Sequence, residues 1–419
     1  MPAAPGGGPL AGIRVVELAS EHAAFAGKLL AGLGADVVVV EPPGGHASRA
    51  FGPFADDRPG PERSLWWWHY NAGKRGVVLD LEAEGELLRR LVAGADVVLE
   101  GEPPGRLAAL GLDHDVLRAG EEGLIWVSVT PFGRDGPRSG EVATDLTVLA
   151  GGGPVWSCGY DDHSLPPVRG GGNQGYHTAS LWAVMATLTA VVNRDLGGSG
   201  QHLDVSMHAA ANVTTEAATY EWLVAGRTVQ RQTGRHAAVT PSMNVNVVAA
   251  DGRGITSGVP PRTAEQFRRV LGWLDELGLR DQVDDEVFLE MGTQIEGVLP
   301  LWEVGVDPEL TAIFAAGRQA LTVIATHLPA EEFFVQAQRL GLACGAILAP
   351  EEVIGNEHFV ARGFPVPLPQ SEVGRDVVHP GAPFRMSATP WRLSRPAPRL
   401  GEHDAEVLGP LWAPARRPG

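Results

Sequence analysis

The stretch "RGGGNQGYHTASLWAVMATL", residues 169–188, places Tyr176 and His177 between a run of three glycines and an apolar helix. Glycine-rich backbone at the start of a helix offers amide groups to a developing oxyanion, and a neighbouring side chain can then act on the same ligand. A phenol with a pKa near ~10 stays protonated at neutral pH, whereas an imidazole with a pKa near ~6.5 can serve as a base. Tyr176 and His177 are therefore candidate catalytic residues, although a histidine in a first helical turn also serves in capping or packing.

The elements around this stretch predict a doubly wound α/β domain. A long apolar helix is predicted over residues 178–193. Buried strands are predicted for five continuous apolar runs, at residues 12–19, 35–41, 75–81, 96–100 and 124–130. Helical patterns separate these runs, so the strands should form a parallel sheet with helices on both faces. From about residue 245 to 340 the pattern changes to one short strand and several helices, so a second, smaller α+β domain is expected.

The composition excludes several classes of function. The chain holds 33 Lys+Arg against 50 Asp+Glu, a formal net charge of −17, and no basic run, so no nucleic-acid partner is expected. Its two cysteines, Cys158 and Cys344, form neither a disulfide framework nor a cysteine-rich metal site, so no metal is expected. We expect a cytoplasmic protein without a signal peptide or membrane span. The first βα turn, "ELASEHAAFAG", lacks the G-x-G-x-x-G motif, so NAD is not expected either.

Several motifs resemble one known family when they are taken in order. The first are "PLAGIRVVELA", "LLAGLGADVVVVEPPGG" and "NAGKRGVVLDL". They are followed by "FGRDGP" with Asp145 after it, by "GGSGQHLDVSM", and by "PGAPFRMSATP" with "APRLGEHDAEVL" near the end. Each motif alone is weak, but this order and spacing resemble the family III CoA-transferases. That group includes formyl-CoA and carnitine CoA-transferases and the α-methylacyl-CoA racemases.

The resemblance implies a fold and a set of ligands. It implies a Rossmann-like, CoA-binding large domain over residues 1–220, completed by residues of about 380–419, with a linker and small domain over 221–379. It also implies an interlocked dimer, with CoA or acyl-CoA as substrate. By the same resemblance, we expect Lys74 and Asn71 to bind CoA. We expect Arg235 and His236, in a long polar connection, to bind the substrate carboxylate.

The resemblance also exposes a missing residue. The family relays the acyl group through an Asp carboxylate, which attacks the thioester and forms a mixed anhydride. Aligned through "LWAVMATL", Tyr176 stands at the position of that Asp, and no Asp or Glu occurs between His163 and Arg194. Tyr176 is then an inert occupant, a hydrogen-bond donor to substrate, or a nucleophile or base of another kind. The racemase branch has a second base beside Asp145, and here that position is Thr144.

Three functions stay open at this point. The first is a CoA-transferase acting on an acyl-CoA thioester and a carboxylic acid, in a homodimer. The second is a non-catalytic subunit that forms a heterodimer with a paralogue retaining the Asp. It is favoured by eroded CoA contacts, since Gly101, Glu102 and Pro103 stand where the family has Asn, an aromatic residue and Arg. The third is an acyl-CoA lyase or isomerase that works without the Asp.

Overall fold

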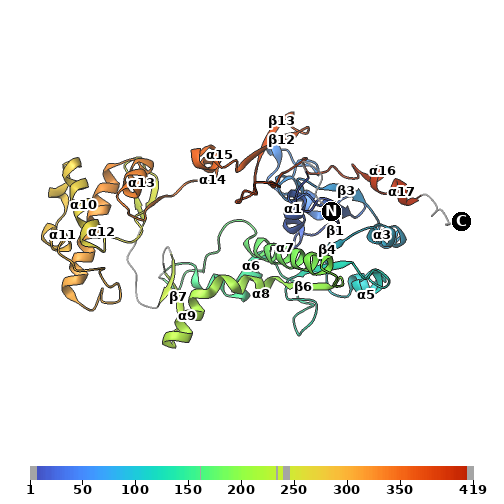
Figure 1. Ribbon diagram of the computed structural model, residues 1–419, viewed down its shortest axis with the longest axis horizontal. Helices are drawn as coiled ribbons and strands as arrows, with labels where there is room; N and C mark the ends of the chain where they lie inside the picture. Colours follow the sequence, from blue (N-terminus) through green and yellow to red (C-terminus); the bar gives the residue numbers. More distant parts are fainter. Residues whose placement is uncertain (1–6, 161, 233–234, 239–245, 413–419) are drawn as a thin grey trace. The chain divides into compact units, whose positions relative to one another are not determined.

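A computed structural model of the chain describes residues 7–160, 162–232, 235–238 and 246–412 (Figure 1). The chain folds into two compact units. The large unit comprises Met1–Arg231, Arg235–Val239 and Glu357–Gly419, and the small unit comprises Gln232–Gly234 and Thr240–Asn356. The sequence predicted these boundaries at about 221 and 379, so the chain leaves the large unit later and returns to it earlier than expected.

The large unit is built on a six-stranded parallel sheet of order β3-β2-β1-β4-β5-β6. All five predicted strands are present, and a sixth follows the long helix. The strands are β1 (Arg14–Leu18), β2 (Asp36–Glu41), β3 (Arg75–Val78), β4 (Val97–Glu100), β5 (Ile125–Thr130) and β6 (His202–Ser206). The predicted α/β class is confirmed.

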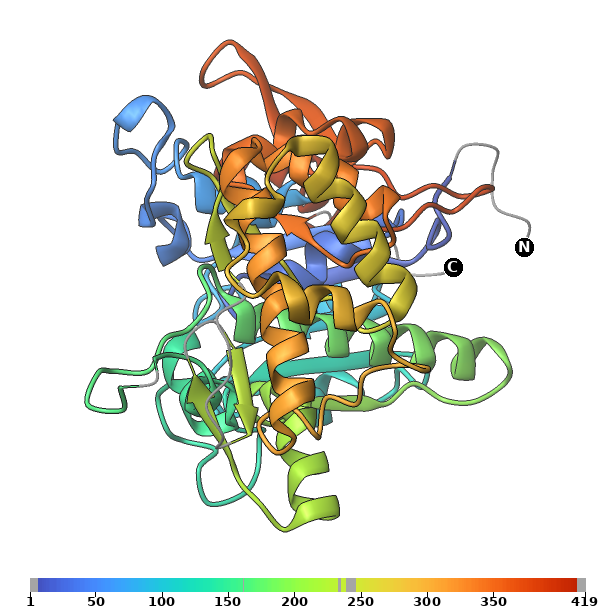
Figure 2. The ribbon, with the colours of Figure 1, turned by 90° about the vertical axis from the view of Figure 1, so that its left-hand side faces the viewer.

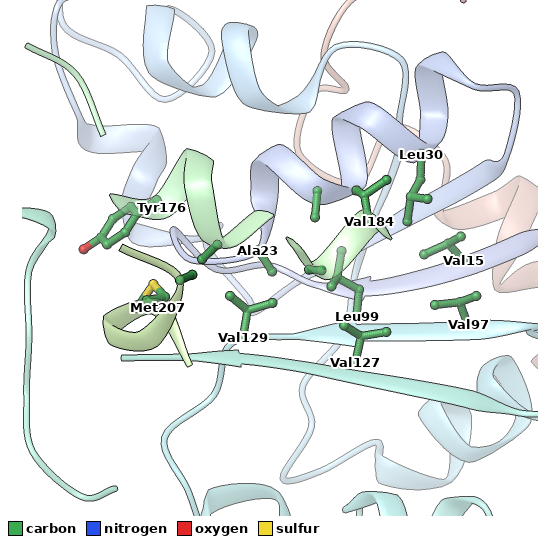
Figure 3. Packing of buried hydrophobic residues seen from close by; sticks show 14 of the residues in the cluster. Val15, Ala23, Leu30, Val97, Leu99, Val127, Val129, Tyr176, Val184 and Met207 are labelled. Carbon is green, nitrogen blue, oxygen red and sulfur yellow. The ribbon is translucent and has the colours of Figure 1, made fainter. Parts of the chain in front are cut away.

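Side chains that alternate along the strands form two separate cores, one on each face of the sheet. Val15 and Val37 pack on one face and Val16 and Val38 on the other. The first face is covered by α1 (Ala24–Gly32), α7 (Gln174–Asp195) and α8 (Met207–Asn212), and the second by α3 (Gly85–Val92), α4 (Arg106–Ala109) and α5 (His114–Leu117). Figure 3 shows the first core, with Val184 of α7 above the strand residues Leu99 and Val127. The period-two alternation explains why each strand is apolar throughout.

The large unit contains further elements outside this sheet and the helices that cover it. Four short 3-10 helices are η1 (Ala47–Ala50), η2 (Ala55–Asp57), η3 (Pro154–Ser157) and η4 (Val213–Thr215). The other helices are α2 (Leu65–Asn71), α6 (Asp145–Gly152), α9 (Glu216–Ala225), α15 (Glu357–Ala361), α16 (Asp404–Val407) and α17 (Gly409–Trp412). Two antiparallel pairs complete it, β7 (Val229–Gln232) with β8 (Arg235–Ala238), and β12 (Pro365–Gln370) with β13 (Arg375–Pro380).

The C-terminal segment rejoins the large unit through the β12–β13 hairpin and then runs along the edge strand β3. Leu368 of β12 packs with Ala72 and Leu393 in a small core of its own. Farther on, the His403 N–H donates to the Gly76 carbonyl at 3.0 Å. These contacts bring the return point forward to Glu357, and they cover a strand edge that would otherwise be open.

The small unit is a helical layer with a short antiparallel sheet, as predicted for an α+β domain (Figure 2). Phe267 and Phe333 lie in its buried core. Its helices are α10 (Ala264–Leu277), η5 (Arg280–Gln282), α11 (Glu286–Gly292), α12 (Pro308–His327), α13 (Ala330–Arg339) and α14 (Pro350–Gly355). Its strands are β9 (Asn246–Val248), β10 (Gly254–Thr256) and β11 (Gly345–Ala346). Along the described chain, no helix combines the length and apolar character that crossing a bilayer requires.

Candidate active site at the first turn of α7

Helix α7 begins at Gln174, earlier than the predicted start at residue 178, because a distant carboxylate caps it. Oδ1 of Asp145 accepts hydrogen bonds from the backbone N–H of Gly175 at 2.7 Å and of Tyr176 at 3.4 Å. The first backbone N–H groups of a helix have no partner within the helix, and a negative charge there is favourable. The cap draws Tyr176 into the first helical turn.

Asp145 is fully occupied in this role. It is the first residue of α6, whose start is capped by the Thr144 and Thr147 side chains. Its second oxygen, Oδ2, accepts from the Arg169 guanidinium at 3.1 Å, and the carboxylate is buried. Attack on a thioester by Asp145 would therefore require it to release the cap of α7 and the ion pair with Arg169.

Tyr176 is a buried phenol at the end of the core under α7. Its side chain is 5% exposed, and its ring meets the His22 ring edge-on, with centroids 5.2 Å apart. Figure 3 shows the hydroxyl pointing away from the labelled core residues. Burial first, and then the negative charges of Glu21 and Asp145, raise the pKa of Tyr176 to about 12. The phenol therefore stays protonated at neutral pH and can donate a hydrogen bond, but it does not act as an anionic nucleophile.

His177 is held by a second phenol. Its Nε2 lies 2.7 Å from the hydroxyl of Tyr70, which also accepts from the Asn173 side-chain amide at 3.3 Å. The ring lies against Phe25, with centroids 4.3 Å apart. Burial lowers the pKa of His177, although the charge of Asp145 opposes this. His177 is thus a neutral, packed imidazole in the structure, and its role as a base stays a prediction.

A cavity of about 540 Å³ opens beyond the carboxyl ends of the first four strands of the sheet. The strand order reverses between β1 and β4, which is where doubly wound folds bind their ligands. The cavity is lined by the loops that follow β1, β2, β3 and β4, including Ser20, Glu21, His22, Pro42, Pro43, His46, Asp80, Leu81, Glu82, Gly101, Glu102, Pro103 and Arg106. His22 of the lining also meets the ring of Tyr176, with centroids 5.2 Å apart, which places the start of α7 behind this wall of the cavity.

The charge around this cavity is predominantly negative. Its three cationic candidates are paired or uncharged, since Arg106 pairs with Glu102 at 2.8 Å and burial lowers the pKa of His22 and, to about 4, that of His46. The acidic residues of the lining are Glu21, Glu41, Asp80, Glu82 and Glu102. Buried Glu41 is paired with Arg49 and Glu102 with Arg106, which leaves Glu21, Asp80 and Glu82 facing an anionic ligand. The phosphates of CoA would meet a repulsive field here.

The predicted CoA-binding pair, Lys74 and Asn71, lies inside the protein instead of on this cavity. Both side chains are buried. The Lys74 ammonium donates to Glu17 Oε1 at 2.7 Å, to the Ala24 carbonyl at 2.9 Å and to Asn71 Oδ1 at 2.9 Å, which uses all three of its donors. Burial raises the pKa of Glu17 to about 6 against the attraction of Lys74. A CoA contact for Lys74 and Asn71 stays a prediction that this geometry disfavours.

Gly27 allows this buried ion pair to form under α1. A Cβ at Gly27 would lie 1.7 Å from Glu17 Oε2.

The predicted substrate-binding residues Arg235 and His236 belong to β8, and their side chains lie outside what the structure describes. One group of three possible metal ligands occurs among the described residues, the consecutive Asp113, His114 and Asp115 at the start of α5, outside the cavity lining.

The comparison with known proteins decides the family. The family model described as CoA-transferase family III matches residues 10–404. The chain belongs to CoA-transferase family III. It is 32% identical over 408 residues to the succinyl-CoA:(R)-benzylsuccinate CoA-transferase subunit BbsE of Thauera aromatica, covering 96% of this chain and 94% of that one.

Further family III members agree with the fold. A succinate–glutarate CoA-transferase of Agrobacterium fabrum is 32% identical over 409 residues, covering 96% of each chain. The solved structure of a CAIB/BAIF family protein from Brucella suis superposes with a TM-score of 0.76 at 26% identity, covering 97% of this chain and 100% of that one. The resemblance read from the motifs is confirmed.

Sequence reasoning singled out Tyr176 and His177 but missed two charged residues near them. Glu21 lines the cavity, and Lys28 of α1 is buried close to His177. A signal for Lys28 was present, because it interrupts the apolar run "AFAGKLLAG" at a position that faces the core. Glu21 follows directly after the first strand, where side chains of a doubly wound fold meet ligands.

Proposed function

We propose that this chain is a subunit of an acyl-CoA:carboxylate CoA-transferase, in which a paralogous partner chain supplies the nucleophilic carboxylate. The observation that carries the proposal is the state of Tyr176. At the position that the family gives to its catalytic Asp stands a buried phenol with a pKa raised to about 12. Its protonated oxygen donates a hydrogen bond but does not accept an acyl group as a carboxylate does.

The reaction makes this substitution decisive. In the family mechanism, a carboxylate oxygen bonds to the acyl carbon while the C–S bond breaks and CoA leaves as thiolate. The acid substrate or the thiolate then attacks the resulting anhydride, and the carboxylate is regenerated. In this chain the carboxylate of Asp145 contacts the backbone of Tyr176, and it is committed to capping α7.

Two further observations support a subunit role. The acidic lining of the 540 Å³ cavity opposes the binding of a phosphate-rich ligand such as CoA by this chain alone. In addition, the relative from Thauera aromatica is named as a subunit of its CoA-transferase. A heteromer also fits the loss of the Asp, because a mixed dimer retains one complete catalytic site.

The test compares the chain alone with the chain co-purified with a paralogue that retains the Asp motif. We expect no CoA transfer from succinyl-CoA to carboxylic acids by the chain alone, and no hydroxylamine-trapped acyl group on it. The complex should transfer CoA and carry the trapped acyl group on the partner chain. Tyr176→Phe in this chain serves as a matched control that should leave the activity of the complex unchanged.

A second candidate is a transferase that is active by itself with Glu21 as the acyl acceptor. It is favoured by the position of Glu21, which lines the cavity and acts electrostatically on Tyr176. Turnover by the chain alone that is lost in Glu21→Gln would establish this candidate and overturn the subunit role. Turnover that survives Glu21→Gln would reject both assignments.

A further inference from the structure

Lys28 is a buried lysine that lacks a partner. The chain has only two lysines, Lys28 and Lys74, and both are buried. Lys74 is fully paired, whereas Lys28 is 2% exposed and its ammonium makes no hydrogen bond or ion pair with any residue that the structure describes. An isolated buried ammonium is costly, and proteins normally provide it with a counterion.

The groups around Lys28 come from four elements and include three histidines. Lys28 of α1 is close enough for its charge to lower the pKa of His69 of α2, His177 of α7 and His379 of β13. We call Lys28, His69, His177 and His379 the Lys28 cluster. Phe25 lies between two of its rings, with centroids 6.4 Å from His69 and 4.3 Å from His177.

The charges that face Lys28 do not neutralise it. Burial first, and then the positive charge of Lys74, lower the pKa of Lys28 to about 7. The carboxylate of Glu17 is engaged with Lys74, and Asp145 is engaged with Arg169 and the start of α7. Lys28 therefore has no acceptor among these groups, whereas the imidazole of His177 is hydrogen-bonded to Tyr70.

A second side chain of the cluster has an unsatisfied atom. His379 is 4% exposed, and its Nε2 has no hydrogen-bond partner within the described chain. His69 and His177 are only partly buried, so the cluster reaches the surface beside these two rings. A ligand that accepts hydrogen bonds and carries negative charge would satisfy both Lys28 and His379.

We propose that the Lys28 cluster binds the carboxylate group of a small organic acid. Two oxygens on one planar group can accept from the Lys28 ammonium and from Nε2 of His379. No arginine is among the described side chains that act electrostatically on the cluster, whereas phosphate sites commonly use arginine. The site lies beside the first turn of α7 through His177, where the acid substrate of a CoA-transferase would be needed.

This proposal is independent of whether the chain itself transfers CoA, because its test reads binding and not turnover. A bound carboxylate restores the counterion of Lys28 and raises its pKa, so binding above about pH 7 must take up a proton. Below about pH 6 Lys28 is already charged and the uptake should vanish. Burial lowers the pKa values of the three histidines in the free chain below 6.5, so they are uncharged at about pH 8.

The experiment is calorimetric titration of the full chain with succinate, glutarate and benzoate, in buffers of different ionisation enthalpy at about pH 6 and 8. We expect binding with an uptake approaching one proton per chain at the higher pH. Lys28→Met should weaken binding at least tenfold and remove the uptake, and His379→Gln should weaken binding and retain it. Circular dichroism confirms that each variant is folded.

The two lysines provide an internal control for the same proposal. Pulse acetylation followed by peptide mass spectrometry should modify Lys28 faster than Lys74, and the acid should protect Lys28 only. The proposal is overturned by carboxylate binding without proton uptake, by unchanged affinity in Lys28→Met, by equal affinity for inorganic phosphate, or by no binding up to about 100 mM.

Discussion

The two buried lysines of this chain differ in whether hydrogen-bond acceptors surround the ammonium group. Lys74 has Glu17, Asn71 and a backbone carbonyl around its ammonium, so it serves as a fixed part of the packing between α1 and the sheet. Lys28, in α1, has no such group around its ammonium, and burial lowers its pKa to about 7. A buried, partnerless group of this kind is retained at a cost to stability, which is typical of binding and catalytic sites.

That cost predicts a stabilising substitution. The pKa of Lys28 is about 7 in the folded chain, against 10.5 for a free lysine. Between about pH 7 and 10 the unfolded chain therefore binds more protons than the folded chain. The free energy of unfolding of the wild type rises with pH over this range. Lys28→Met removes the penalty and should raise the free energy of unfolding at pH 7 by up to about 4 kcal/mol. The gain should shrink as pH approaches about 10. Urea unfolding at several pH values checks this, and a pH-independent gain would contradict it.

The acidic cavity predicts a change in CoA affinity. Glu102 pairs with Arg106, the cation on that wall, and both line the cavity. Glu102→Gln removes one negative charge and frees Arg106, so the affinity for CoA should rise about three- to tenfold, on the order of 1 kcal/mol. Glu122→Gln, at a surface position outside the cavity lining, is the matched control. Calorimetry with CoA at low and high salt should show the gain fading as salt screens it.

At the scale of elements, the strands could be predicted from the sequence and the start of α7 could not. Each strand is a continuous apolar run because the sheet is buried on both faces, and this pattern is local. The start of α7 depends on Asp145, about thirty residues earlier in the chain, whose carboxylate caps Gly175 and Tyr176. A cap that comes from another helix leaves no mark in the periodicity of the helix it caps.

This cap yields a prediction about α7. Asp145→Ala leaves the amides of Gly175 and Tyr176 without acceptors and removes the partner of Arg169, so the chain should lose about 2–4 kcal/mol of stability. Asp145→Asn keeps one acceptor oxygen and should lose about half as much. Thermal unfolding ranks the two variants, and equal losses would show that the charge, and not the hydrogen bonds, holds the start of α7.

At the scale of the whole chain, the motifs identified the family because each lies at a strand end or a turn and their order follows the fold. The alignment of Tyr176 with the family's Asp rests on the same motifs and stays a prediction. The Lys28 cluster could not be predicted from the sequence, because its members stand at positions 28, 69, 177 and 379 and meet only after the β12–β13 hairpin returns to the large unit. Residues that are far apart in the chain form a site only through packing that no local pattern encodes.

The outer face of the large unit predicts assembly with another chain. Large apolar side chains of α7 and α9 are exposed, namely Leu181, Trp182, Met185, Val192, Tyr220, Trp222 and Leu223. Exposed large apolar side chains gathered on a helix commonly mark protein interfaces, and the proposed subunit role requires one. We therefore expect the purified chain to sediment as a dimer or to recruit its paralogue through this face.

Two charged substitutions on that face test the assembly. Trp182→Glu combined with Met185→Glu places charge on neighbouring turns of α7 without touching the cores beneath, so the chain should sediment as a folded monomer whose melting temperature falls by no more than the loss of the dimer contacts accounts for. Val142→Glu is the matched control, because Val142 is 97% exposed in a loop outside α7 and α9. A double variant that retains the wild-type sedimentation coefficient would remove the α7 face from the interface and leave α9 as the surface to test.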